Sequence, residues 1–184
     1  MITSIRERKL NLWTEFRFRT GDGMHIKTYV TEDFTNYKNP SMFIGCVSCD
    51  GKCCREGGFP LSTCINNDWC VTSVVDVCDE ELIRLYMSNP ITKSIVFGLL
   101  EPFMQYEEIY GFVKKLREEF GCSDDVVIYT GYYEEEVEDK VSEIAKLGNI
   151  VIKFGRFVPG KEHHFDEVLG VELASPNQYA KKVG

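Results

Sequence analysis

The chain has 184 residues, of which 43% are hydrophobic and 27% are charged, a composition typical of one globular domain with a sizeable core. Its formal net charge of −8 argues against a nucleic-acid-binding protein, because such proteins usually present a basic face. It shows no apolar run of the length that a signal peptide or a membrane span requires. We therefore expect a cytoplasmic protein that binds neither nucleic acid nor membrane.

Residues 1–45 predict a β-rich segment at the edge of a sheet. Residues 15–20 (EFRFRT) and 24–30 (MHIKTYV) alternate apolar and polar side chains, as half-buried strands do. The GDG between them favours a turn, so the two strands predict an N-terminal β-hairpin. A loop at 36–40 then leads to a short apolar strand at 41–45 (SMFIG).

Residues 46–78 predict a long irregular segment, because they are rich in Cys, Gly, Ser and Asn. Segments of this length in compact domains usually carry a function or are disordered. Five of the eight cysteines of the chain lie within residues 46–64 of this segment, and a metal can order a segment that has little core of its own. These five are Cys46, Cys49, Cys53, Cys54 and Cys64.

From residue 79 onward the pattern alternates between helices and strands. The helices show an apolar face at the 3.6-residue period, and the strands are apolar, β-branched runs that indicate burial on both faces. This alternation predicts βαβ units around a mostly parallel sheet, in a single domain spanning 1–184. In chain order the predicted elements are a helix at 79–87, a strand at 93–97, a helix at 105–121, a strand at 125–131, a helix at 134–148, a strand at 149–155, and one weak strand with a polar tail at 168–184.

The ends of these strands predict the position of a ligand site, because ligands of such sheets bind at the carboxyl ends of the strands. The turns at 98–102, 129–132 and 154–157 each follow a predicted strand, and the cysteines follow the strand at 41–45. We therefore expect four strand ends to face one cavity, with the cysteines at its mouth.

The cysteine spacing by itself leaves several kinds of site open. A disulfide framework is disfavoured in a reducing compartment. Structural zinc commonly takes two C-x2-C pairs, and Cys46–Cys49 is the single pair with that spacing. A redox C-x-x-C usually opens a helix, which this one is not expected to do. An iron–sulfur cluster held by three cysteines would keep one iron open for a ligand, and Cys49-x3-Cys53 followed by a later cysteine fits that arrangement.

An ordered set of motifs resembles the small radical S-adenosylmethionine (SAM) proteins that activate anaerobic ribonucleotide reductase. Cys49-Asp-Gly-Lys-Cys53 matches the first half of the C-x3-C-x2-C motif of that family, and Cys64-Ile-Asn66 resembles its third cysteine. The stretches that resemble its strand ends are IVFGLLEP at 95–102, VVIYTGY at 126–132, IVIKFGRF at 150–157 and LASPNQ at 173–178. The resemblance covers roughly residues 40–180.

The resemblance implies a partial (βα) barrel that carries a 4Fe–4S cluster and SAM. The implied cluster ligands are Cys49, Cys53 and Cys64, with Cys54 and Cys46 as alternates. Glu101 would hold the SAM ammonium group. The other implied cofactor-binding residues are Gly98, Tyr129, Thr130, Gly131, Gly155, Asn177 and Gln178.

The resemblance also implies an activity and partners. A one-electron reduction would cleave SAM to methionine and a 5′-deoxyadenosyl radical, which abstracts hydrogen from a glycine of a partner enzyme. That partner would be a glycyl-radical enzyme such as anaerobic ribonucleotide reductase. The electron donor would be a flavodoxin or a ferredoxin.

Two departures from the family pattern keep a second interpretation open. Ten residues separate Cys53 from Cys64 where the family has two, and Leu99-Leu100 replaces a Gly-Gly pair before Glu101. Glycine at such a turn lets the backbone approach a ligand closely. The alternative is a non-catalytic Fe–S or zinc-binding module that serves in interaction or electron transfer.

Overall fold

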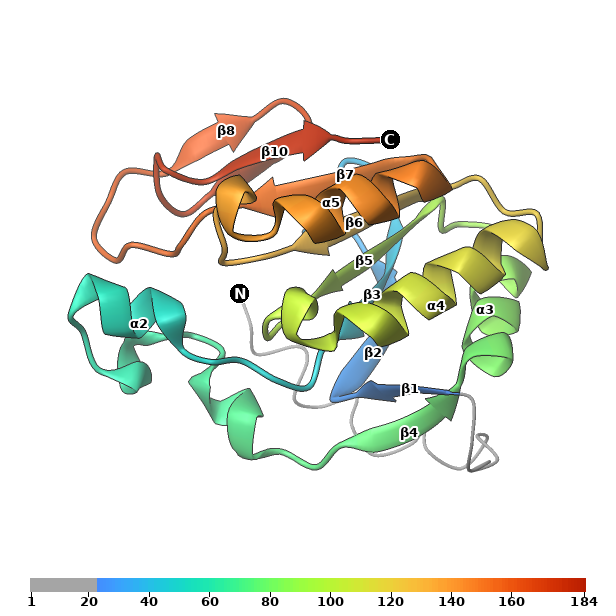
Figure 1. Cartoon of the computed structure of the whole chain (residues 1–184), viewed down its shortest axis with the longest axis horizontal. Coiled ribbons are helices and arrows are strands. Elements are labelled where there is room, and N and C mark those ends of the chain that lie inside the picture. Colours follow the sequence, from blue (N-terminus) through green and yellow to red (C-terminus); the bar gives the residue numbers. More distant parts are fainter. Residues whose placement is uncertain (1–22) are drawn as a thin grey trace.

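The computed structural model describes residues 23–184, so the first strand of the predicted hairpin, at 15–20, lies outside the described residues. Its centre is a six-stranded sheet in the order β10-β7-β6-β5-β3-β2 (Figure 1). The strands are β1 (Gly23–Ile26), β2 (Thr28–Asp33), β3 (Ser41–Gly45), β4 (Val75–Cys78), β5 (Ser94–Gly98), β6 (Asp125–Tyr129), β7 (Ile150–Phe154), β8 (His164–Asp166), β9 (Val171–Leu173) and β10 (Tyr179–Lys182). The α-helices are α2 (Lys52–Gly57), α3 (Asp79–Ser88), α4 (Tyr106–Glu118) and α5 (Glu138–Ile144).

The expected α/β class is confirmed. Strands β3, β5, β6 and β7 are parallel neighbours, while β2 and β10 pair antiparallel at the two edges. The described sheet is therefore open and does not close into a barrel. The four parallel strands and the helices α3, α4 and α5 occupy the predicted places, and the ends of α5 are replaced by 3₁₀-helices at Glu134–Glu136 and Ala145–Leu147.

Both faces of the sheet are buried, as the apolar strands predict. The apolar faces of α3, α4 and α5 pack with residues such as Ile95, Phe97 and Ile152 in the larger core cluster. On the other face, Val96, Val127 and Val151 pack with side chains such as Tyr37 and Leu169. Figure 1 shows α4 and α5 crossing the same face of the sheet.

Two strands pair in ways that the local pattern did not predict. The predicted strand at 24–30 is interrupted at Lys27: β1 pairs antiparallel with β4, whereas β2 joins the central sheet beside β3. Because β4 ends the cysteine-rich segment, that segment is not irregular throughout. It also contains α2 and the 3₁₀-helices Leu61–Thr63 and Asn67–Val71.

The C-terminal tail also forms more structure than predicted. In place of one weak strand and a polar tail, β8 and β9 form a two-stranded sheet and β10 adds to β7. The rings of Tyr179 and Phe154 lie 5.5 Å apart across the β10–β7 pair, and Ala180 is 8% exposed. No helix of residues 23–184 is long and apolar enough to cross a membrane.

Candidate functional site

The carboxyl ends of the four parallel strands lie along one edge of the sheet. Gly45 at the end of β3 is in register with Gly98 at the end of β5, and Tyr129 at the end of β6 is in register with Lys153 in β7. Cys46 follows β3 directly, and its backbone amide donates to the Gly98 carbonyl over 2.9 Å. The cysteine-rich segment therefore leaves the sheet at this edge.

Glu101 is buried at this edge and joins two strand ends. Its side chain, 5% exposed, accepts hydrogen bonds at Oε1 from Thr130 Oγ1 (2.7 Å) and the Phe103 amide (3.1 Å), and at Oε2 from the Gly131 amide (2.8 Å). Burial raises the pKa of Glu101, and these hydrogen bonds offset part of the rise. A carboxylate has about four acceptor positions, so one position on Oε2 remains for a ligand.

Gly131 leaves a small space that a thiol and this carboxylate share. A Cβ built on Gly131 would lie 2.8 Å from Cys53 Sγ and 3.5 Å from Glu101 Oε2. Only a residue without a side chain therefore fits between the cysteine-rich segment and the end of β6. This places Cys53 and Glu101, which are 48 positions apart in sequence, at the same point of the site.

The cysteines differ in their surroundings. Cys46 is buried in the core cluster, which favours a packing role, and Cys54 is the other buried thiol. Cys49 is exposed and its sulfur accepts a hydrogen bond from the Gly51 amide over 3.3 Å. Cys53 and Cys64 are half-buried. Within residues 23–184, no three His, Cys, Asp or Glu side chains come together as a metal site.

The thiols nevertheless affect the pKa values of one another. Burial raises the pKa of Cys49 to about 11, with Cys53 contributing to the rise. Burial also raises the pKa of Cys54, and Cys64 and Cys53 add to it. These thiols are therefore protonated near neutral pH, and binding a metal or cluster would displace their protons.

The predicted cofactor-binding residues fall into three groups. Thr130 and Gly131 contact Glu101, as described. Tyr129 points to the other side of the sheet, where its hydroxyl donates to the Asn36 carbonyl over 2.5 Å, and a Cβ on Gly98 would meet the Phe43 ring at 3.2 Å.

Gly155, Asn177 and Gln178 form a junction between the ends of β7 and β10. Gly155 has φ 98°, and a Cβ there would lie 2.5 Å from the Asn177 carbonyl oxygen. The Gln178 side chain, 5% exposed, donates to the Gly155 carbonyl over 3.3 Å, and Asn177 Nδ2 donates to the Arg156 carbonyl over 2.8 Å. Their side-chain amides hold the turn after β7.

The turn before Glu101 keeps a glycine-like backbone although it has leucines. Leu99 has φ 76°, a conformation that costs a residue with a Cβ about 1–2 kcal/mol. Its side chain packs on Gly45, where a Cβ would lie 2.9 Å from Leu99 Cδ2, and Leu100 is 7% exposed. The turn therefore places a leucine side chain at a position whose φ favours glycine.

Arg156 is buried, although arginine side chains usually lie on the surface. It is 6% exposed and forms a bidentate pair with Glu136, with Nη1–Oε2 at 2.6 Å and Nη2–Oε1 at 2.7 Å. These hydrogen bonds lower the pKa of Glu136 to about 2. Two residues of α2, Lys52 and Glu56, join the same group of charges.

Lys153 is a site residue that the sequence reasoning missed. It is 6% exposed, and its Nζ donates to the Gly155 carbonyl over 2.9 Å. Burial lowers the pKa of Lys153 to about 8, while nearby Cys53 and Glu101 oppose the shift. A single lysine inside the apolar run IVIKF was the available signal, because unpaired lysines are rarely buried.

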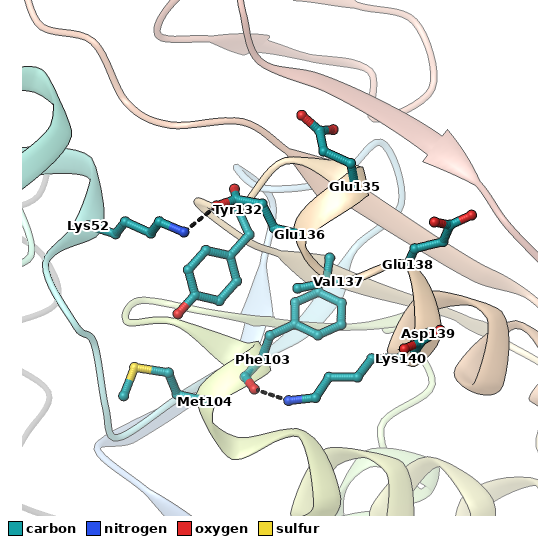
Figure 2. Close-up of a pocket in the computed structure, with 10 residues that line it drawn as sticks. All are labelled: Lys52, Phe103, Met104, Tyr132, Glu135, Glu136, Val137, Glu138, Asp139 and Lys140. Atoms are coloured by element: carbon teal, nitrogen blue, oxygen red, sulfur yellow. Dashed lines mark hydrogen bonds and ion pairs between the residues drawn. The ribbon is translucent and has the colours of Figure 1, made fainter.

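An open hollow of about 680 Å³ lies beside this edge. Figure 2 shows Lys52 and Tyr132 on one side of it, Phe103 and Met104 below, and the acidic stretch 135–139 opposite. Lys52 and Tyr132 are the sequence neighbours of Cys53 and Gly131. The hollow therefore lies next to the segments that carry Cys53 and Gly131.

The family of the chain follows from comparison with known proteins. Residues 45–175 match the model of the 4Fe-4S single cluster domain family (Fer4_12), which covers most of the chain and all of the predicted site residues except Asn177 and Gln178. The chain belongs to this family and has a 4Fe–4S cluster-binding domain. Comparisons with curated proteins and with solved structures gave no match.

The residues of the site fit such a cluster in donor chemistry, although no three such side chains lie together within residues 23–184. Thiolates are the usual ligands of iron–sulfur clusters, and all eight cysteines are free. The missing side chain of Gly131 leaves a space beside Cys53 that a Cβ would fill. Cys49, Cys53 and Cys64 remain the predicted ligands, with Cys54 as the nearest alternate. A bound cluster supplies one-electron chemistry at the edge where Glu101 lies.

Proposed function

We propose that this chain is a radical SAM enzyme of the activase type, which uses its cluster to cleave SAM reductively. One observation carries the proposal. Three motifs of the resemblance, at Glu101, Thr130-Gly131 and Gly155-Arg156, lie at one sheet edge together with Cys53. A buried carboxylate needs hydrogen-bond partners, and Glu101 takes two of its three from the end of β6, which carries the Thr130-Gly131 motif.

Each residue has a defined part in this proposal. The remaining acceptor position of Glu101 Oε2 takes the ammonium group of SAM. Thr130 and Gly131 fix the orientation of that carboxylate, because both hydrogen bonds come from the end of one strand. The hollow beside Lys52 and Tyr132 admits the segment of a partner that receives the radical.

The partner proposed is a glycyl-radical enzyme, with anaerobic ribonucleotide reductase as the first candidate. A flavodoxin or ferredoxin would supply the electron. Both follow from the resemblance of the motifs to the activating proteins of that enzyme.

The deciding experiment is spectroscopic. Protein purified or reconstituted without oxygen is reduced, and its absorption and EPR spectra are recorded with and without SAM. An EPR signal that SAM perturbs, with 5′-deoxyadenosine and methionine formed after reduction, supports the enzyme. The variant Glu101→Gln should keep the cluster absorption and weaken SAM binding about tenfold or more, because a charge-assisted contact is lost. An intact cluster whose EPR spectrum does not change when SAM is added would contradict the proposal.

The second candidate is a cluster-binding module without SAM chemistry. It is favoured by Leu99, which occupies the glycine-like position of the turn and fills the space against Gly45. It is also favoured by the three hydrogen bonds that Glu101 already makes within the chain. A zinc-loaded protein with no visible absorption would select the zinc form of this module.

Substitution of the leucines tests whether the turn before Glu101 obstructs SAM. Leu99→Gly keeps the backbone conformation and removes the side chain, and Leu99→Gly with Leu100→Gly restores the family pattern. Tighter SAM binding in either variant means that the leucines obstruct a working site. Unchanged binding of SAM means that the site is built without the glycines.

A further inference from the structure

The helix that carries two of the cysteines has almost no apolar anchor. Helix α2 has six residues, far fewer than an isolated helix needs for stability, and it contains Cys53 and Cys54. Of residues 47–76, only Cys54 is buried. Something other than a hydrophobic core must therefore determine where α2 lies against the sheet.

A closed group of four charges supplies that anchor. Arg156, which follows β7, forms its bidentate pair with Glu136, and Glu56 Oε2 of α2 lies 2.6 Å from Arg156 Nε. Lys52, at the start of α2, pairs with the same Glu136 and lies 3.7 Å from Glu56. We name Lys52, Glu56, Glu136 and Arg156 the α2 clamp. It has two positive and two negative members, and both ends of α2 take part.

The clamp is built around Arg156 in a way that lysine could not copy. The guanidinium is 7% exposed and lies 4.7 Å from the centroid of the Tyr133 ring. Two nitrogens of the planar guanidinium, Nη1 and Nη2, donate to Glu136, and the third, Nε, faces Glu56. An ammonium group is a point charge and cannot make this bidentate contact.

The α2 clamp also contacts the residue that borders the sulfur of Cys53. Arg156 Nη1 also donates to the carbonyl of Gly131 over 3.4 Å, and Gly131 is the residue whose missing side chain makes room for Cys53 Sγ. Arg156 therefore binds α2 and also holds Gly131, the residue that borders one of the thiols of α2.

We infer that Arg156 is a positioning residue for the cluster site: through the α2 clamp it sets Cys53 against Gly131 at the sheet edge. The inference rests on the cluster-binding domain and is independent of SAM chemistry. A chain that binds a cluster without SAM needs the clamp equally.

The test measures the exposure of individual thiols in the cluster-free full chain. In Arg156→Met, alkylation of Cys53 by iodoacetamide, followed by mass spectrometry, should be about tenfold faster than in the parent chain, as expected for loss of charge-assisted hydrogen bonds. The alkylation rate of Cys122 should not change. Reconstituted Arg156→Met should hold less iron per chain, and its EPR line shape should broaden.

Arg117→Met is the matched control, because Arg117 is a second partly buried arginine on the opposite side of the domain. It donates to the carbonyls of Cys122, Leu147 and Gly148 and has no contact with α2 among the hydrogen bonds of residues 23–184. This variant should accelerate the alkylation of Cys122 and leave that of Cys53 unchanged. A general loss of stability would accelerate both thiols in both variants.

Two further variants keep the test decisive if Arg156→Met does not fold. Glu56→Gln alters a half-exposed side chain and should raise the Cys53 rate by a smaller factor, with no further rise when it is added to Arg156→Met. Arg156→Lys should fall between the parent and Arg156→Met, because it keeps the charge and loses the fork. An unchanged Cys53 rate in folded Arg156→Met, or in Glu56→Gln if Arg156→Met is unfolded, overturns the inference.

Discussion

The parallel core and the cysteine-rich segment are stabilised in opposite ways. Every residue of β5 and β7 is buried, and side chains such as Phe97 and Phe112 are fully enclosed. The cysteine-rich segment, by contrast, exposes apolar side chains: Val71 is 89% exposed and Ile65 is 69% exposed. Figure 1 shows α2 and the chain that follows it lying to one side of the sheet.

This difference indicates which part of the chain depends on the bound group. The core buries enough apolar surface to fold without a cofactor. The segment at 47–76 has ion pairs, glycine turns and thiols in place of a core, so binding of a cluster adds directly to its stability. The core therefore positions Glu101 and Gly131, and the bound group completes the ligand side of the site.

The largest expected effect breaks the core. Phe112→Ala removes a fully buried ring of α4 whose centroid lies 5.6 Å from that of Phe97 in an edge-on contact. It should lower the free energy of unfolding by about 3–5 kcal/mol, measured by urea denaturation of the cluster-free chain. Val71→Ala, in the cysteine-rich segment, should change it by less than about 0.5 kcal/mol. Equal effects of the two variants would remove the distinction between the regions.

The sequence predicts the core well because its signal is local. Each parallel strand is a short apolar run, and each helix has its apolar face within one window of residues. The pairings of β1 with β4 and of β10 with β7 join residues that are far apart in the chain. A four-residue strand such as β10 has no distinctive pattern before its partner is known, so it was predicted as a polar tail.

The site was predicted in part, for a related reason. Parallel strands bring their carboxyl ends together, so Glu101 and Thr130 could be predicted to meet. The direction of one side chain at a strand end depends on its register, and Tyr129 points to the other face. The burial of Arg156 depends on Glu136 and Glu56, which lie 20 and 100 positions away in sequence, and no local pattern joins them.

A smaller effect, confined to the site, is expected from Gly131→Ala. The new Cβ would lie 2.8 Å from Cys53 Sγ, so the cysteine-rich segment must move away from the sheet edge. We expect a cost of about 1–3 kcal/mol in the cluster-loaded chain and a several-fold lower iron content after reconstitution. Iron and sulfide analysis together with absorption measures this.

Gly111→Ala is the paired control for that substitution. Gly111 lies within α4, and a Cβ there meets no atom of the described chain within 4 Å. The variant should be more stable by about 0.5–1 kcal/mol, because alanine favours the helix, and should bind iron as the parent does. If both glycine variants lose iron to the same extent, the space beside Cys53 has no special role.

The smallest expected effect concerns pH and the charges that hold α2. The bidentate contact with Arg156 lowers the pKa of Glu136 from 4.5 to about 2, so its carboxylate stabilises the folded chain above pH 4.5 and loses this contribution as the pH falls towards 2. The side chain is 22% exposed, so we expect the effect to be about 1 kcal/mol or less. The difference in unfolding free energy between the parent chain and Glu136→Gln, measured in urea, should therefore narrow between pH 4.5 and 2. In an Arg156→Met background this pH dependence should largely disappear, because Arg156 is the main cause of the lowered pKa of Glu136. If the pH dependence persists in that background, Lys52 is the residue that lowers the pKa.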